Sequence, residues 1–210
     1  MGKIEFNKQQ KLNSILDAAL ELFTTKGVTN TSIAEISQKS GIAKGTFYLY
    51  FKDKYDIRNH LISHESSKLF REAAAALEKE KQMPDYNGEY EKTEEQIIFI
   101  VNNIIDKLNS NQILLIFISK NLSWGIFREA ISANLSSDEV NFKEVCFNML
   151  NSDDREFVDP EIMLYMITEL VSSTSYSAIL YKDPVDLESI KPYLFDTIRF
   201  IIANHVKKQV

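Results

Sequence analysis

Apolar residues recur at every third or fourth position along most of this chain, which is the spacing of one face of an α-helix. The first such segment begins near Lys8 and ends at Gly27, because glycine readily takes the positive φ that closes a helix. The positions expected to face inward are Leu12, Ile15, Ala19, Leu22 and Phe23. The pattern predicts a first helix that packs one face on a core.

A second and a third helix are predicted directly afterwards. The stretch "SIAE" places Ser32 three residues before Glu35, a capping box that predicts the start of a helix ending near Ser40. Gly41 then predicts a tight turn, and residues 44–51 have the pattern of another short helix.

The rest of the chain is also helical in pattern. Residues 54–81 contain no Pro or Gly, which favours one uninterrupted helix, and residues 82–92 form a loop. Pro192 indicates either that the last helix starts near Lys191 or that its first turn is kinked. No segment shows the alternation of a strand, so we predict an all-α fold. The later helices are expected at residues 93–108, 112–123, 137–150, 160–181 and 190–206.

Composition and charge divide the chain into two parts. With 210 residues, of which 44% are hydrophobic and 26% charged, it can bury a sizeable core. Residues 1–60 hold nine Lys and Arg against six Asp and Glu, whereas residues 61–210 hold fifteen against twenty-four, for a total net charge of −6. This asymmetry indicates that the first part tolerates a polyanionic partner and that the second does not.

The sequence predicts neither a membrane span nor a secretory signal. The most apolar runs, "IIFIVNNII" and "ILLIFIS", are far shorter than the roughly 20 residues that span a bilayer, and no apolar run follows the first residues. We therefore expect a cytoplasmic protein without a membrane partner.

Few groups suit catalysis or metal binding. Cys146 is the only cysteine, which excludes an intrachain disulfide and predicts a small buried hydrophobe. His60 and His64 lie four residues apart, but "HLISH" lacks both the Glu of zinc-protease motifs and an evident third ligand. Because the chain also lacks a Gly-rich phosphate loop and a nucleophile–base pair, we expect neither an enzyme nor a bound cofactor or metal.

The stretch "GIAKGTFYLYFKDK" indicates a different chemistry. A helix, a glycine turn and a second helix is the arrangement that places the second helix in the major groove of duplex DNA. Lysine ammonium groups and the hydroxyls of threonine and tyrosine can donate to phosphates and base edges. Four apolar side chains are expected to pack beneath: Ile36, Ile42, Phe47 and Phe51. Five residues are expected on or near the outer face: Lys44, Gly45, Thr46, Tyr48 and Tyr50. The alternative is a helical hairpin with packed aromatic residues and solvated lysines.

The segment "TSIAEISQKSGIAKGTFYLYFKDKYDI" strongly resembles the DNA-binding motif of the TetR family of bacterial transcriptional regulators, and the likeness spans roughly residues 10 to 58. The resemblance implies an all-helical homodimer, with a DNA-binding domain over residues 1–54 and an effector-binding and dimerisation domain over residues 55–210. The DNA-contacting residues that it implies are Thr31, Ser32, Lys44, Gly45, Thr46, Tyr48, Tyr50 and Lys54. The chain departs from the family pattern at Ala43, where Ser or Thr often caps the recognition helix, at Ser37 and Ser40, which are commonly Ala, and at Tyr50, where His is frequent.

An effector pocket is expected in the second domain, walled in part by the long helix over residues 54–81. Aromatic residues are more plentiful there than basic ones, which favours a largely apolar, neutral or cationic effector. A buried amide such as that of Asn103 needs a partner that a ligand could supply, although aromatic residues at helical spacing more often form simple core. The candidate effector-binding residues are Phe99, Asn103, Phe117, Trp124, Phe127 and Tyr176.

The last two helices are strongly apolar. They carry more apolar residues than are needed to bury one face of each helix within a single protomer. They could pair across a twofold axis as a four-helix bundle, and the small residues at 172–175 would allow close approach of helices. The alternative is a hairpin within one protomer. The candidate interface residues are Met166, Leu170, Phe195, Ile198 and Ile202.

Taken together, these patterns predict a dimeric, ligand-responsive transcriptional regulator. It would bind a pseudo-palindromic operator in duplex DNA, most often as a repressor, and a small apolar effector would release it. The alternative is a helical small-molecule carrier whose DNA-binding domain is vestigial, against which the intact Lys44, Tyr48 and Lys54 count.

Overall fold

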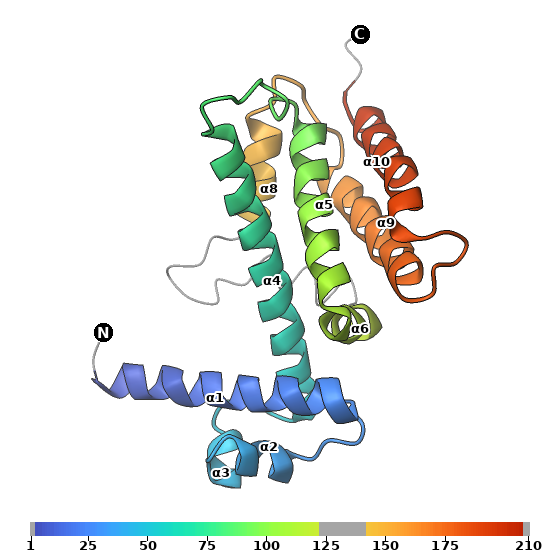
Figure 1. Cartoon of the computed structure of the whole chain (residues 1–210). Helices are drawn as coiled ribbons and strands as arrows, with labels where there is room; N and C mark the ends of the chain where they lie inside the picture. The colour runs from blue at the N-terminus through green and yellow to red at the C-terminus, as the bar shows by residue number, and fades with distance from the viewer. Residues whose placement is uncertain (1–2, 122–141, 208–210) are drawn as a thin grey trace. The chain divides into compact units, whose positions relative to one another are not determined.

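The computed structural model describes residues 3–121 and 142–207, most of which lie in α-helices (Figure 1). Within these residues one isolated antiparallel bridge joins Phe157 and Val206, and no strand forms. The predicted all-α fold is confirmed. The helices are α1 (Lys3–Lys26), α2 (Ile33–Lys39), α3 (Lys44–Phe47), α4 (Lys54–Lys81), α5 (Thr93–Ser110), α6 (Gln112–Asn121), α8 (Phe142–Asn151), α9 (Pro160–Leu180) and α10 (Leu187–Asn204).

The helix bounds match the sequence pattern best where it is long and uninterrupted. The helix α4 has the predicted bounds, whereas α1 starts earlier than the predicted Lys8. The helix α3 ends at Phe47, because the residues up to Tyr50 continue as turns instead of a regular helix. The predicted residues 122–123 and 137–141 lie outside the described residues.

The start of α10 differs from the prediction. Asp186 is its N-cap, and the Asp186 carboxylate accepts a hydrogen bond of 2.9 Å from the backbone N–H of Ser189. Pro192 therefore lies inside the helix and not at its start. It is tolerated because it is exposed and still near the first turns, where water can satisfy the carbonyl that loses its partner. The expectation of a start near Lys191 was wrong because the capping signal of Asp186 outweighs the proline.

The chain forms two compact units, Met1–Glu65 and Ser66–Val210. The boundary between them falls inside α4, so that the first turns of this helix belong with the N-terminal unit. The assignment of residues 1–54 to DNA binding stays a prediction, and residues 55–65 pack with them.

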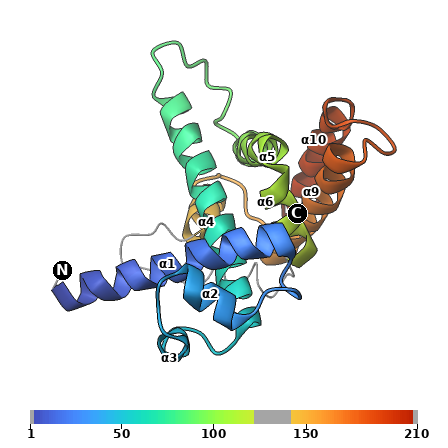
Figure 2. The ribbon, with the colours of Figure 1, turned by 60° about the horizontal axis from the view of Figure 1, so that its bottom comes forward.

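In the N-terminal unit α2 packs against both α1 and α3 (Figures 1 and 2). The capping box predicted at its start is present: the backbone N–H of Glu35 donates to Ser32 Oγ at 3.2 Å, and the N–H of Ser32 donates to the Glu35 carboxylate at 2.9 Å. Gly27 and Gly41 have φ angles of 81° and 70°, which explains glycine at both turns. The side chains buried in this unit include Ile15, Ala19, Phe23, Ile36, Phe47, Phe51, Ile57 and Leu61.

In the C-terminal unit α9 and α10 form a hairpin, and α5 contacts α6, α8, α9 and α10 (Figure 1). Two polar links hold the start of α5. Arg155 donates to the carboxylates of Glu94 and Asp153, and Arg199 donates to Glu95 at 2.8 Å. The hydrogen bonds from Arg155 and from Thr93 hold the pKa of Asp153 well below its ordinary value.

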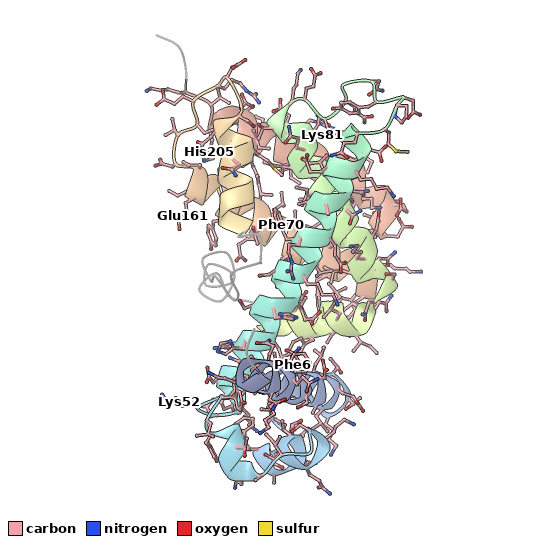
Figure 3. The ribbon with its side chains drawn as sticks, turned by 90° about the vertical axis from the view of Figure 1, so that its left-hand side faces the viewer. Phe6, Lys52, Phe70, Lys81, Glu161 and His205 are labelled. Atoms are coloured by element: carbon pink, nitrogen blue, oxygen red, sulfur yellow. The ribbon has the colours of Figure 1, made fainter. Side chains whose placement is uncertain are left out.

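A smaller cluster joins α4, α5 and α8. Phe70, labelled in Figure 3, packs there with Ala73 and Leu77 of its own helix and with Cys146 and Met149 of α8. Cys146 is buried, as predicted, and desolvation raises the pKa of its thiol to about 12. The thiol therefore behaves as part of the apolar packing and not as a nucleophile.

Truncating Ile198 should destabilise the C-terminal unit. Its side chain is fully buried, so Ile198→Ala should lower the free energy of unfolding by about 2–5 kcal/mol through reduced burial and the cavity left behind. The control is Ile113→Ala, the same substitution at a side chain that is 62% exposed, which should change it by less than about 0.5 kcal/mol. Urea unfolding followed by circular dichroism measures both, and equal effects would contradict the assignment of Ile198 to the core.

Candidate nucleic-acid interface and ligand cavity

The single turn of α3 separates an inner from an outer side. Phe47 is fully buried, and its ring contacts those of Tyr48 and Phe51 at centroid distances of 5.6 and 5.7 Å. Lys44 and Tyr48 are exposed and four residues apart, so they share one face of the helix. The structure therefore brings together a lysine and a tyrosine on an outer face while a phenylalanine anchors the helix from below.

Glycine at position 45 is not required by the packing of the chain itself. Its φ is not in the positive range, and a Cβ added to Gly45 would meet nothing within 4 Å. This is consistent with a surface that an external partner approaches closely. Ala43, at the N-cap, makes no side-chain cap, as its departure from the family pattern predicted.

Four of the predicted DNA contacts have partners within the chain: Thr31, Ser32, Tyr50 and Lys54. Thr31 is only 2% exposed, and its hydroxyl donates to the carbonyl oxygen of Gly27 at 2.9 Å. Its hydroxyl closes the turn between α1 and α2, so it does not face an external partner in this structure. Ser32 is exposed and caps α2. The phenol of Tyr50 donates to the backbone carbonyl of Lys8 at 3.4 Å, and Thr46 is half-buried.

Lys54 is held by the same turn. Its ammonium donates to the carbonyl oxygens of Thr29 and Thr31 at 2.8 and 3.1 Å. By contrast, among the described residues no hydrogen bond or ion pair engages the ammonium groups of Lys44 and Lys52. Lys52 is exposed at the surface of the N-terminal unit (Figure 3) and was not among the predicted contacts. The sequence signal for Lys52 is its position in the loop between α3 and α4, where a lysine side chain does not pack along a helix.

The C-terminal unit contains a cavity of about 160 Å³. Its walls come from α4, α5, α6, α8 and α9, so the prediction that α4 would form one wall agrees with the structure. The lining is aliphatic with one aromatic ring, that of Phe70, among the described residues. The hydroxyl-bearing residues at the wall are Ser66, Ser67, Ser119, Thr168, Ser172 and Ser175.

Of the residues predicted to line this pocket, the four that the structure describes are not at its wall. Phe99 packs on Tyr90, with the ring centroids 4.9 Å apart, and Tyr176 contacts Tyr181 at 5.9 Å. Phe117 is buried away from the cavity lining, and the buried Asn103 Oδ1 has no partner but is not at the wall. The predicted Trp124 and Phe127 lie outside the described residues. The faces of α5 and α9 that point to the cavity are largely aliphatic, and the predicted aromatic side chains of these helices, Phe99 and Tyr176, pack elsewhere in the core.

The predicted dimer face also needs correction. Ile198 and Ile202 are fully buried, and Leu170 and Phe195 pack against the same core of the protomer. Of the predicted set, Met166 is exposed at 37%. The apolar side chains that are exposed on these two helices are Ile162, Tyr165 and Met166 on α9 and Tyr193 and Phe200 on α10.

Comparison with known proteins identifies the N-terminal unit. The model of "Bacterial regulatory proteins, tetR family" matches residues 15–61. The segment over residues 15–61 therefore belongs to the TetR family. The segment matched by this family model contains α2, α3 and the first turns of α4, together with the second half of α1.

Two curated relatives and one solved structure illustrate the range of likeness. The HTH-type transcriptional regulator AcrR of Shigella flexneri is 42% identical over 55 residues, which is 26% of this chain and 26% of AcrR. The "Probable HTH-type transcriptional regulator YttP" of Bacillus subtilis (strain 168) is 25% identical over 203 residues, covering 91% of this chain and 92% of YttP. The crystal structure of FadR from Bacillus subtilis in complex with stearoyl-CoA superimposes with a TM-score of 0.60 at 18% identity, over 91% of this chain and 98% of FadR.

The highest sequence identities cover short segments. The chain matches only about a quarter of the length of the first curated relatives. Similarity to FadR at 18% identity shows a shared fold and nothing about the ligand. Among the described residues no helix has the length and apolar character to cross a membrane.

Replacing Lys54 and Lys44 should have different effects on the protein. Lys54→Met removes two charge-assisted hydrogen bonds, so it should speed amide hydrogen exchange in residues 29–36 and weaken binding to every duplex. It should leave the slope of log affinity against log salt unchanged, because the protein still neutralises the same number of phosphates. Lys44→Met should leave exchange unchanged and reduce that slope by about 0.9 for each phosphate that Lys44 neutralises in the wild-type complex.

Hydrogen exchange by mass spectrometry and DNA-binding anisotropy at about 50 to 200 mM salt separate the two lysines. A smaller salt slope for Lys54→Met with unchanged exchange would contradict the internal role of Lys54 and favour a direct phosphate contact.

Proposed function

We propose that this TetR-family protein is a dimeric, ligand-responsive transcriptional regulator that acts as a repressor. Two copies would place their α3 helices in successive major grooves of a pseudo-palindromic operator. The observation that carries the proposal is the outer face of α3, where Lys44 and Tyr48 are exposed above a fully buried Phe47 within the segment that the family model matches. We expect the protein to bind its operator in the cytoplasm.

The cavity supports ligand control. It is enclosed largely by aliphatic side chains, and α4 contributes Ser66, Ser67, Leu69 and Phe70 to its wall. The same continuous helix begins at Lys54 in the N-terminal unit. An effector that favours a DNA-incompetent conformer would therefore act on a helix that both units share.

The effector is expected to be smaller and less charged than stearoyl-CoA, the ligand in the FadR structure. A phosphate-bearing head group needs Arg or Lys partners, and none of the described residues at the cavity wall is charged. A small-molecule carrier would also use such a cavity. The exposed Lys44 and Tyr48, for which a carrier has no use, favour the regulator.

Specific DNA binding tests the function directly. Full-length protein should bind one site in the DNA upstream of its own gene at least about 10³-fold more tightly than random duplex, measured by fluorescence anisotropy at a fixed salt concentration. Affinity no better than for random duplex would reject the proposal.

Thr46→Ala should change which bases the protein prefers. Thr46 lies on α3, and removing one base contact costs about 1–3 kcal/mol of discrimination at one position of each half-site. Selection from a randomised operator library, followed by sequencing, measures this change. Thr25→Ala is the control, because that exposed hydroxyl bonds the carbonyl oxygen of Glu21 within α1 and should leave the base preference as it is.

A charge on the exposed face of α10 should dissociate the proposed dimer. Phe200 is 69% exposed in the protomer, so Phe200→Glu should leave the fold intact, abolish the dimer at micromolar concentration and weaken operator binding at least tenfold. Ile113→Glu places the same charge at a side chain that is 62% exposed on α6 and should change neither. Sedimentation velocity measures the mass, and a wild-type protein that is a monomer at micromolar concentration would refute the interface.

A further inference from the structure

The cavity wall is mainly aliphatic, with hydroxyl groups at a few positions. The helices α5 and α6 contribute aliphatic side chains such as Ile100, Ile104 and Leu115. The helix α9 contributes Thr168, Ser172 and Ser175 at helical spacing beside aliphatic side chains, and α4 contributes Ser66 and Ser67. A ligand that fits must therefore be aliphatic along most of its surface, with a polar group directed at one of these hydroxyls.

Two of these hydroxyls have no hydrogen-bond partner. Ser175 is only 2% exposed, and its Oγ is buried without a partner, as is the Oγ of Ser66 on α4. Thr168, on the same stripe, differs because its hydroxyl donates to the carbonyl oxygen of Leu164 at 2.8 Å. Neighbouring atoms cover both oxygens in this structure, so an occupant would bond Ser175 Oγ after the side chain rotates about χ1. It would then recover the free energy that is lost by burying an unpaired hydroxyl.

The size and charge of the wall restrict the occupant further. A cavity of about 160 Å³ is close to the roughly 150 Å³ of an engineered apolar cavity that binds benzene, which indicates a frame of about six carbon atoms. No described residue at the wall is charged, so a carboxylate or an ammonium group would be buried without a counter-charge. The described wall therefore favours an uncharged effector over the cationic effectors that the sequence left open.

We propose that the cavity binds an uncharged aliphatic molecule that carries one hydroxyl or carbonyl group, and that Ser175 Oγ, assisted by Ser66 Oγ, bonds this group. The inference rests on the proposed function in one respect: it takes the bound molecule to be the effector. Its chemistry follows from the orphaned hydroxyls and the uncharged wall.

Binding to the full-length protein tests the ligand class. Isothermal titration at pH 7 with 1-hexanol, 2-hexanone, hexanoate, hexylammonium and toluene should show the alcohol and the ketone binding at least tenfold more tightly than either ion. Toluene serves as a probe that fills the cavity without a strong hydrogen bond. Equal or tighter binding of hexanoate or hexylammonium, or no binding of the alcohol and the ketone, would overturn the proposal.

Two serine variants test the anchor. Ser175→Ala should weaken 1-hexanol by about threefold to tenfold and leave toluene unchanged, because it removes one hydrogen bond and no wall. In the absence of ligand it should raise the melting temperature or leave it unchanged, since an unpaired buried hydroxyl is removed. Ser173→Ala is the matched control, the same substitution at an exposed position of α9 that does not line the cavity.

Ser66→Ala provides a second measurement on a different helix and should weaken 1-hexanol in the same range. Unchanged affinity in both Ser175→Ala and Ser66→Ala would overturn the anchor, as would a marked loss of unliganded stability in Ser175→Ala, because that would show a structural hydrogen bond.

Operator binding by the same samples, measured without ligand, separates the two proposals. Specific DNA binding together with preferred binding of hexanoate would retain the regulator and reject this ligand class. Preferred binding of 1-hexanol, dependent on Ser175, without specific DNA binding would support the ligand class and reject the regulator.

Discussion

The uninterrupted helix α4 is the constraint on which the rest of the structure depends. Its 28 residues contain neither Gly nor Pro, so nothing in its sequence favours a break between the two compact units. Ile57 and Leu61 are buried in the N-terminal unit, and Phe70 and Leu77 are buried in the C-terminal unit. One helix therefore supplies apolar side chains to both cores.

The N-terminal unit is organised around the turn that precedes α2. The positive φ of Gly27 reverses the chain, the hydroxyl of Thr31 closes the turn, and the ammonium of Lys54 holds its carbonyl oxygens. Ser32 and Glu35 then start α2 through the capping box. The start of α4 is thereby linked to the start of α2, and Phe47 fixes α3 from below. The exposed Lys44 and Tyr48 are therefore presented by groups that make hydrogen bonds or apolar contacts within the chain.

Much of this arrangement could be predicted because it is encoded locally. The capping box, the two glycine turns and the proline-free α4 are short-range signals, and each is present in the structure. The roles of Thr31 and Lys54 could not be predicted from the motif, because a hydroxyl or an ammonium at a turn can donate equally well to the chain or to a phosphate. Only the geometry of the neighbouring carbonyl oxygens distinguishes these roles.

The C-terminal unit was less predictable because its helices are apolar on more than one face. Residues 162–167 of α9 are six consecutive apolar residues, so periodicity does not say which of them point inward. Ile198 and Phe200 show the same ambiguity on α10, where the first is fully buried and the second is exposed. The size of the aromatic side chains predicts that they form the wall of a binding pocket. In the structure, large rings fill the core and smaller aliphatic and hydroxyl side chains leave the free volume.

Under the proposed ligand chemistry, the unpaired hydroxyls would give the cavity a means of influencing DNA binding. A ligand shifts an equilibrium only by the difference in its affinity for the two conformers, so its contacts must depend on conformation. Ser66 lies twelve positions after Lys54 on α4, about 18 Å along the helix axis at roughly 1.5 Å per residue. A ligand that bonds Ser66 and Ser175 would restrain α4 and α9 at that point. Because Lys54 on the same helix bonds the carbonyl oxygens of the turn before α2, a shift of α4 selected by the ligand would act on that turn.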